Sequence, residues 1–81
     1  MSDVAERIIK VTAETLKVDP GRIKEDMRFV EDLGAESIQS VELVAAFEEE
    51  FDIEMDEEAA LGVKTVGKAI EFITEVIESG D

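Results

Sequence analysis

The stretch that decides the fold is Leu33-Gly34-Ala35-Glu36-Ser37-Ile38-Gln39-Ser40-Val41-Glu42-Leu43, in which a loop ends and a long helix begins. Gly34 permits a sharp turn into that helix, and the spacing of apolar residues predicts a helix from Ser37 to Phe51. Ser37 therefore lies where backbone N–H groups lack intrahelical partners and where the helix dipole is positive. A phosphate ester on Ser37 would be stabilised there. A serine at this position can also be a plain N-cap, so both roles stay open.

Two further long helices are expected near the ends of the sequence. Asp3, with Glu6 three residues later, predicts a capping box at the start of a helix over residues 3–17. Thr65 is a good N-cap for a helix over residues 66–78. The apolar spacing indicates which residues of these two helices face the core: Val4, Ile8, Val11, Thr12, Leu16, Val66, Ala69, Ile70, Ile73 and Ile77.

The remaining segments are a long connection and a short helix. Pro20 suits the first position of a helical turn capped by Asp19, and we read residues 18–35 as an ordered crossover. The apolar side chains of this crossover are expected to pack against the helices: Val18, Ile23, Met27, Phe29, Val30 and Leu33. A short helix over residues 56–61 ends at Gly62. No strand pattern is present, so the sequence predicts an all-α four-helix bundle. It has three long helices, a short third helix and a long loop between the first two.

The helix over residues 37–51 carries two apolar stripes. The stripe expected in the core contains Leu43, Val44, Phe47 and Phe51. The second contains Ile38, Val41 and Ala45, and carboxylates flank it: Glu42, Glu48 and Glu49. A helix in a small bundle needs one buried stripe. An apolar centre with a charged rim resembles a protein interface, although the second stripe could also pack under the long loop.

Composition limits the possible functions. The chain has 81 residues, which is one domain spanning 1–81, and it contains no His and no Cys. Its net charge is −14, and residues 29–63 hold twelve acidic residues and no Lys or Arg. This charge excludes nucleic acid as a partner and would attract basic patches on proteins. The N-terminus lacks a signal segment and no apolar run could span a membrane, so we expect a soluble cytoplasmic protein.

The acidic segment after residue 51 does not form a specific metal site. An EF-hand loop beginning at Asp52 would need Gly where Glu57 stands and Glu where Val63 stands. Clustered carboxylates could still bind Mg²⁺ or Ca²⁺ loosely. The carboxylates are expected on solvated helix faces, and no pair is placed for acid–base catalysis. The sequence therefore does not indicate an enzyme.

The chain resembles acyl carrier proteins from about Val4 to Ile77, and the resemblance is densest from Phe29 to Asp52. The similar residues are Phe29-Val30-Glu31-Asp32-Leu33-Gly34-Ala35, Glu36-Ser37-Ile38, Val41-Glu42-Leu43-Val44 and Phe47-Glu48-Glu49-Glu50-Phe51. The family motif Asp-Ser-Leu reads Glu36-Ser37-Ile38 in this chain. The resemblance implies that Ser37 bears 4'-phosphopantetheine from coenzyme A and that acyl intermediates are held on it as thioesters.

The resemblance also implies partners and an acyl cavity. A phosphopantetheinyl transferase would load Ser37, and fatty-acid or related enzymes with basic patches would dock on the second helix of a monomeric carrier. The docking positions implied are Ile38, Val41, Glu42, Ala45, Glu48 and Glu49. Ala59, Ala60, Leu61 and Val63 would gate the cavity, or they are ordinary core. Two alternatives remain: a specialised carrier of aminoacyl or polyketide units, and an unmodified acidic interaction module.

Overall fold

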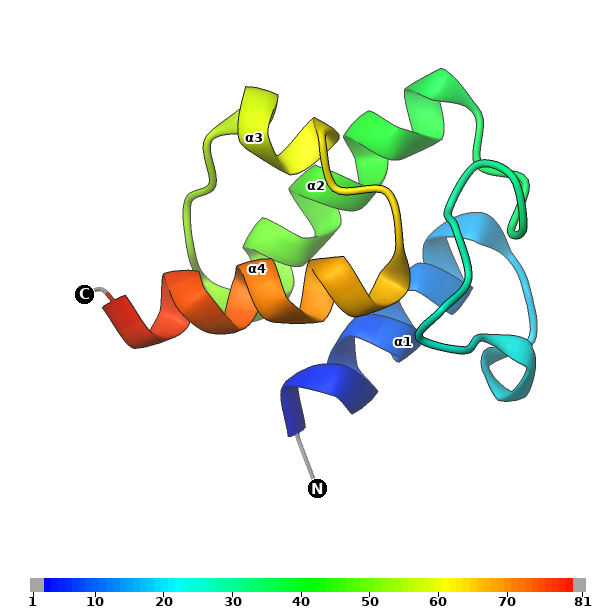
Figure 1. The fold of residues 1–81 in the computed structure, drawn as a ribbon, viewed down its shortest axis with the longest axis horizontal. Helices are drawn as coiled ribbons and strands as arrows, with labels where there is room; N and C mark the ends of the chain where they lie inside the picture. Colours follow the sequence, from blue (N-terminus) through cyan, green and yellow to red (C-terminus); the bar gives the residue numbers. More distant parts are fainter. Residues whose placement is uncertain (1–2, 80–81) are drawn as a thin grey trace.

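The computed structural model describes residues 3–79, which fold into the expected helical bundle (Figure 1). The helices are α1 (Asp3–Leu16), α2 (Ser37–Phe51), α3 (Glu57–Leu61) and α4 (Val66–Ser79), with a 3₁₀ turn η1 at Pro20–Arg22. Helix α1 packs against both α2 and α4, and α3 packs against α2. Helices α2 and α4 are not a closely packed pair. The fold class predicted from the sequence is thus confirmed.

Three helix boundaries differ from the prediction by one residue: α1 ends at Leu16, α3 begins at Glu57 and α4 ends at Ser79. Lys17 does not continue α1, because its backbone has a φ of 60° and is left-handed. Asp3 is already helical, so it is not the N-cap that we expected. The caps predicted for η1 and α4 are present. Asp19 accepts a hydrogen bond from Gly21 N–H (2.9 Å) at η1, and Thr65 Oγ1 accepts one from Lys68 N–H (3.1 Å) at α4.

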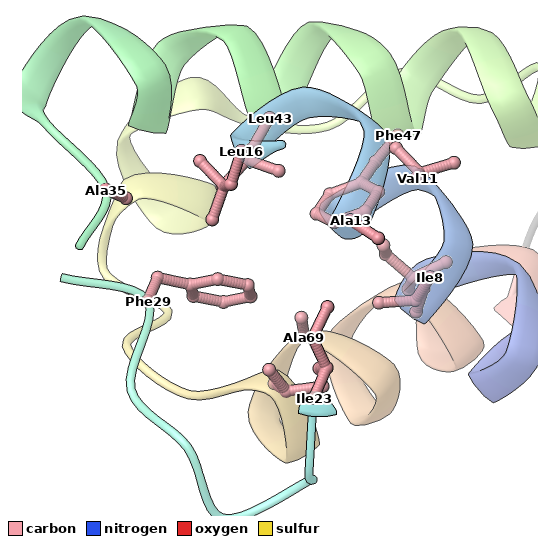
Figure 2. Packing of buried hydrophobic residues seen from close by; sticks show 12 residues of the cluster. Ile8, Val11, Ala13, Leu16, Ile23, Phe29, Ala35, Leu43, Phe47 and Ala69 are labelled. Atoms are coloured by element: carbon pink, nitrogen blue, oxygen red, sulfur yellow. The ribbon is translucent and has the colours of Figure 1, made fainter. Parts of the chain in front are cut away.

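One hydrophobic core joins the three long helices to the long connection (Figure 2). The ring of Phe29 points from the connection into the space between α1 and α4. The buried residues of the core are Ile8, Val11, Ala13, Leu16, Ile23, Phe29, Ala35, Leu43, Phe47, Val66, Ala69 and Ile73. Two residues that we expected in the core are exposed instead: Val30 (53%) and Ile77 (42%). Ile77 lies in the last turn of α4, where the helix extends past the core.

The long connection is tied to the start of α4 by backbone hydrogen bonds. Phe29 N–H donates to Lys64 O (3.0 Å), and Val66 N–H donates to Met27 O (3.0 Å). Gly67 N–H donates to Glu25 O (2.8 Å), and a Cβ at Gly67 would lie 3.1 Å from that same oxygen. The connection therefore satisfies N–H groups in the first turn of α4, and glycine permits its close approach. None of the helices within residues 3–79 combines the length and apolar character needed to cross a membrane.

Candidate functional site

Backbone hydrogen bonds hold the turn that leads into α2. Gly34 has a φ of +75°, which glycine adopts without strain. Its N–H donates to Val30 O (3.1 Å), and Ala35 N–H donates to Phe29 O (2.9 Å). Ala35 is buried, so the chain is anchored in the core two residues before Ser37.

An ion pair closes the same turn. The Asp32 carboxylate accepts hydrogen bonds from Arg28 N–H (2.8 Å) and from Arg28 Nε (3.3 Å). The hydrogen bond from the backbone N–H of Arg28 is the main cause that lowers the pKa of Asp32, and the side-chain hydrogen bond acts in the same direction. A lowered pKa means, by linkage, that the closed turn is favoured by the ionised form of Asp32.

Glu36, rather than Ser37, caps α2. Glu36 has an extended backbone, and its N–H donates to Gln39 Oε1 (2.9 Å). Its carbonyl accepts a hydrogen bond from Ser40 N–H (2.9 Å), as an N-cap carbonyl does. Ser37 is the first residue of the helix. The plain N-cap role that the sequence left open for Ser37 is therefore wrong, because Glu36 occupies that position.

The Ser37 hydroxyl is open to solvent. Ser37 is exposed, and its side chain makes no hydrogen bond with any residue of the described range 3–79. The N–H groups of Ser37 and Ile38 also have no acceptor within that range. Two free N–H groups at the positive end of a helix dipole favour an anion bonded to this hydroxyl. The residues present thus fit a phosphate ester at Ser37.

An apolar cavity of about 70 Å³ lies between α2 and α4. Ser40 lines it one helical turn after Ser37, and α3 contributes Ala60 and Leu61. Val63 also lines the cavity, whereas Ala59 is exposed and does not. The other lining residues are Phe29, Val30, Glu31, Leu43, Val44, Phe47, Met55, Lys64, Ala69, Phe72 and Ile73. Sequence reasoning missed Ser40 and Phe72, although Ser40 follows Ser37 at a spacing that places both on one helix face.

The second apolar stripe of α2 faces solvent. Ile38 is 66% exposed and Val41 is 44% exposed, and Ala45 is exposed as well. The alternative that this stripe packs under the long loop is therefore wrong. Glu42 and Glu49 are exposed beside it, so an apolar centre flanked by carboxylates is accessible on α2.

Glu48 differs from these two carboxylates because it is used inside the molecule. It is half-buried, and its Oε2 accepts a hydrogen bond from Met55 N–H (2.8 Å) in the segment between α2 and α3. Glu50 is also engaged, since its Oε2 lies 2.9 Å from Arg7 Nε of α1. The acidic run at the end of α2 thus contains structural carboxylates that its sequence does not distinguish from exposed ones.

An exposed serine hydroxyl at the start of α2, with an apolar cavity lined from one turn farther along that helix, suits a carrier of a covalently attached group. The family described as "Phosphopantetheine attachment site" matches residues 6–73 of this chain. The chain is also similar to the acyl carrier proteins of Caulobacter vibrioides (strain NA1000 / CB15N) and Phenylobacterium zucineum (strain HLK1). Each is 53% identical over 75 residues, which cover 93% of this chain and 96% and 95% of those proteins.

The chain therefore belongs to the acyl carrier protein family. It is a phosphopantetheine-bearing acyl carrier and not an enzyme. When bound, the phosphopantetheine group supplies the thiol that holds an acyl group as a thioester, which the protein's own residues do not supply because it contains no Cys. The family, fold and cofactor that the sequence indicated are confirmed.

Proposed function

We propose that Ser37 is the residue that bears 4'-phosphopantetheine. The observation that carries this assignment is the exposed and unpaired Ser37 hydroxyl at the first position of α2, beside two free N–H groups. Phosphoryl transfer from coenzyme A would join the Ser37 oxygen to phosphorus and release adenosine 3',5'-bisphosphate. The chain has no His to activate the hydroxyl, so a separate phosphopantetheinyl transferase supplies the catalysis.

The acyl chain is proposed to enter the cavity between α2 and α4. Ser40 lines the cavity one turn from the attachment point, which gives the arm a short path to an apolar interior. Ala60, Leu61 and Val63 act as the gate, because they line the cavity from α3 and the connection after it. Ala59 is left out of the proposed gate, because it is exposed and does not line the cavity.

The exposed face of α2 is proposed as the docking surface for a monomeric, cytoplasmic carrier. Ile38, Val41 and Ala45 form its apolar centre, and Glu42 and Glu49 its acidic rim. Its partners are the transferase and acyl-processing enzymes of fatty-acid or related biosynthesis that carry basic patches. Glu48 contributes charge but is held by Met55 N–H, so its main role is structural.

The attachment site is tested by intact mass. The protein is incubated with coenzyme A, Mg²⁺ and a broad-specificity phosphopantetheinyl transferase, and the expected product gains one phosphopantetheinyl group. Ser37→Ala should gain none and should keep its helical circular dichroism. Ser40→Ala is the matched control, because it removes a hydroxyl one turn away and should be modified normally. Modification of Ser37→Ala would overturn the assignment, and failure of the native protein to be modified would favour an unmodified interaction module.

The docking surface is tested by charge reversal. Glu42→Lys with Glu49→Lys should slow association with the transferase about tenfold or more at low salt, because electrostatic steering raises association rates by about 10–1000-fold. The thermal midpoint should change little, since both side chains are exposed. Glu14→Lys with Glu78→Lys, at exposed positions of α1 and α4, is the control of equal charge change. An equal effect of the control would show that net charge, not the α2 face, steers association.

A further inference from the structure

A second hollow lies on the outer side of α4. This open groove of about 460 Å³ runs along one face of the helix, where Lys68, Phe72 and Glu75 recur at helical spacing. The other lining residues are Gly62, Val63, Lys64, Thr65 and Glu71. The groove is therefore built from α4 and from the connection that leads into it.

The groove and the apolar cavity share one wall. Val63, Lys64 and Phe72 are the residues that line both hollows. On the cavity side Phe72 is joined by Ala69 and Ile73, and on the groove side by Lys68 and Glu75. Phe72 has the largest apolar side chain of the three shared residues and is half-buried. Its ring is thus the main apolar barrier between the two spaces.

The backbone parts of this wall are held by hydrogen bonds, whereas the Phe72 side chain is held by packing against the core. Val63 N–H donates to Ala60 O (3.0 Å), and Lys64 O accepts from Phe29 N–H (3.0 Å). An aromatic ring is held only by packing and by its rotamer preferences. Phe72 is consequently the place where the wall can be opened without breaking a backbone hydrogen bond.

The position of Phe72 has a consequence for an acyl chain. A chain attached at Ser37 passes Ser40 on α2 and crosses toward α4, where Phe72 lines the far side. The cavity of about 70 Å³ is smaller than the roughly 150 Å³ that holds a benzene ring, so it accepts only part of a long chain. Resting on the proposed function, we propose that Phe72 is the stop that limits the length of acyl chain buried in the carrier and separates the cavity from the α4 groove.

The experiment measures how thermal stability depends on chain length. The carrier is loaded with straight-chain acyl groups from hexanoyl to hexadecanoyl, and its thermal midpoint is followed by circular dichroism. Each buried methylene stabilises the folded state, so the midpoint should rise with chain length and become constant once the cavity is full. In Phe72→Ala the rise should continue for at least two further methylenes, because the chain enters the groove. Phe72→Leu should extend the rise to a smaller number of further methylenes. It replaces Phe72→Ala in the experiment if Phe72→Ala does not fold.

The control is Phe51→Ala, a second Phe-to-Ala change whose side chain packs against the core and lines neither hollow. Phe51→Ala should lower the thermal midpoint at every chain length. The midpoint should still become constant at the same chain length as in the native protein. Amide chemical shifts of Lys68 and Glu75 should respond to long chains in the Phe72 variants. The proposal is overturned if fully loaded native and Phe72 proteins reach their plateau at the same length, or if Phe51→Ala shifts it equally. Mass spectrometry of each sample before thermal unfolding shows whether the acyl group was attached at Ser37. A failure of attachment is thus distinguished from a failure of the Phe72 proposal.

Discussion

At the scale of single residues, two hydroxyl groups without partners have opposite consequences. Ser37 is exposed, so water solvates its hydroxyl and the group stays available for modification. Thr12 is fully buried in α1, and its Oγ1 has no hydrogen-bond partner within the described residues. A buried polar atom without a partner costs about 1–3 kcal/mol of stability. The Ser37 hydroxyl is therefore accessible for the modification that we propose, whereas the Thr12 hydroxyl lowers stability because it is buried without a hydrogen bond.

Thr12→Val should raise the free energy of unfolding by about 1 kcal/mol. Valine keeps the branched shape of threonine and removes the unsatisfied oxygen. The measurement is urea unfolding followed by circular dichroism, since the chain has no Trp or Tyr. Thr15→Val, a half-buried position on the same helix, is the control and should change stability less. A loss of stability in Thr12→Val would show that the hydroxyl is satisfied in solution.

At the scale of elements, α1 and α2 end in the same way. Lys17 follows α1 with a φ of 60°, and Asp52 follows α2 with a φ of 55°. Val18 N–H donates to Ala13 O (3.0 Å), and Ile53 N–H donates to Glu48 O (3.1 Å). This is the six-to-one hydrogen bond of the Schellman motif, whose left-handed position favours glycine. Both helices are thus terminated by geometry that their own residues disfavour.

Lys17→Gly should stabilise the protein by about 1 kcal/mol, because a side chain in the left-handed region costs about 1–2 kcal/mol and the added chain flexibility offsets part of that gain. Lys17→Ala removes the same charge but keeps Cβ, and it should give no comparable gain. Both variants are compared with the native protein by urea unfolding. Equal stability of the glycine and alanine variants would mean that the charge, and not the backbone conformation, governs this position.

At the scale of the whole molecule, charge opposes the compact fold. The net charge is −14, and the three ion pairs found within residues 3–79 each join partly or largely exposed side chains. Exposed pairs contribute little stability. The Arg7 side chain is the most connected of these, since it also donates to Glu50 O (2.6 Å) and lies 4.4 Å from the centre of the Phe51 ring. We therefore expect repulsion among the acidic residues to limit the stability of the fold.

Raising the ionic strength from low salt to about 0.5 M NaCl should increase the thermal midpoint by roughly 4–8 °C, equivalent to about 1 kcal/mol for a domain of this size. Salt shortens the Debye length and screens charges that lie farther apart. The midpoint is followed by circular dichroism at neutral pH. A midpoint that stays constant or falls with NaCl would contradict the view that carboxylate repulsion limits stability.

The sequence by itself determined the features that depend on near neighbours along the chain. Helical periodicity located α2 and the core face with Leu43 and Phe47. Local turn chemistry located Gly34, whose left-handed conformation leads to Ser37, because the φ preference of glycine does not depend on distant contacts. The resemblance to a family then suggested the role that we propose for Ser37. Gln39, three residues after Glu36, was also a local signal for the true cap, and it was overlooked.

Only the tertiary structure decided the different roles of residues that have the same type of side chain. Glu48 is tied to Met55 N–H whereas Glu42 and Glu49 face solvent, and Ile77 is exposed although Ile73 is buried. Phe72 lines the groove on α4 and also the cavity, to which α2 and the long connection contribute. These differences arise from contacts between segments far apart in the chain. Periodicity specifies the face of a helix on which a residue lies, but not what lies opposite it or where the opposing surface ends.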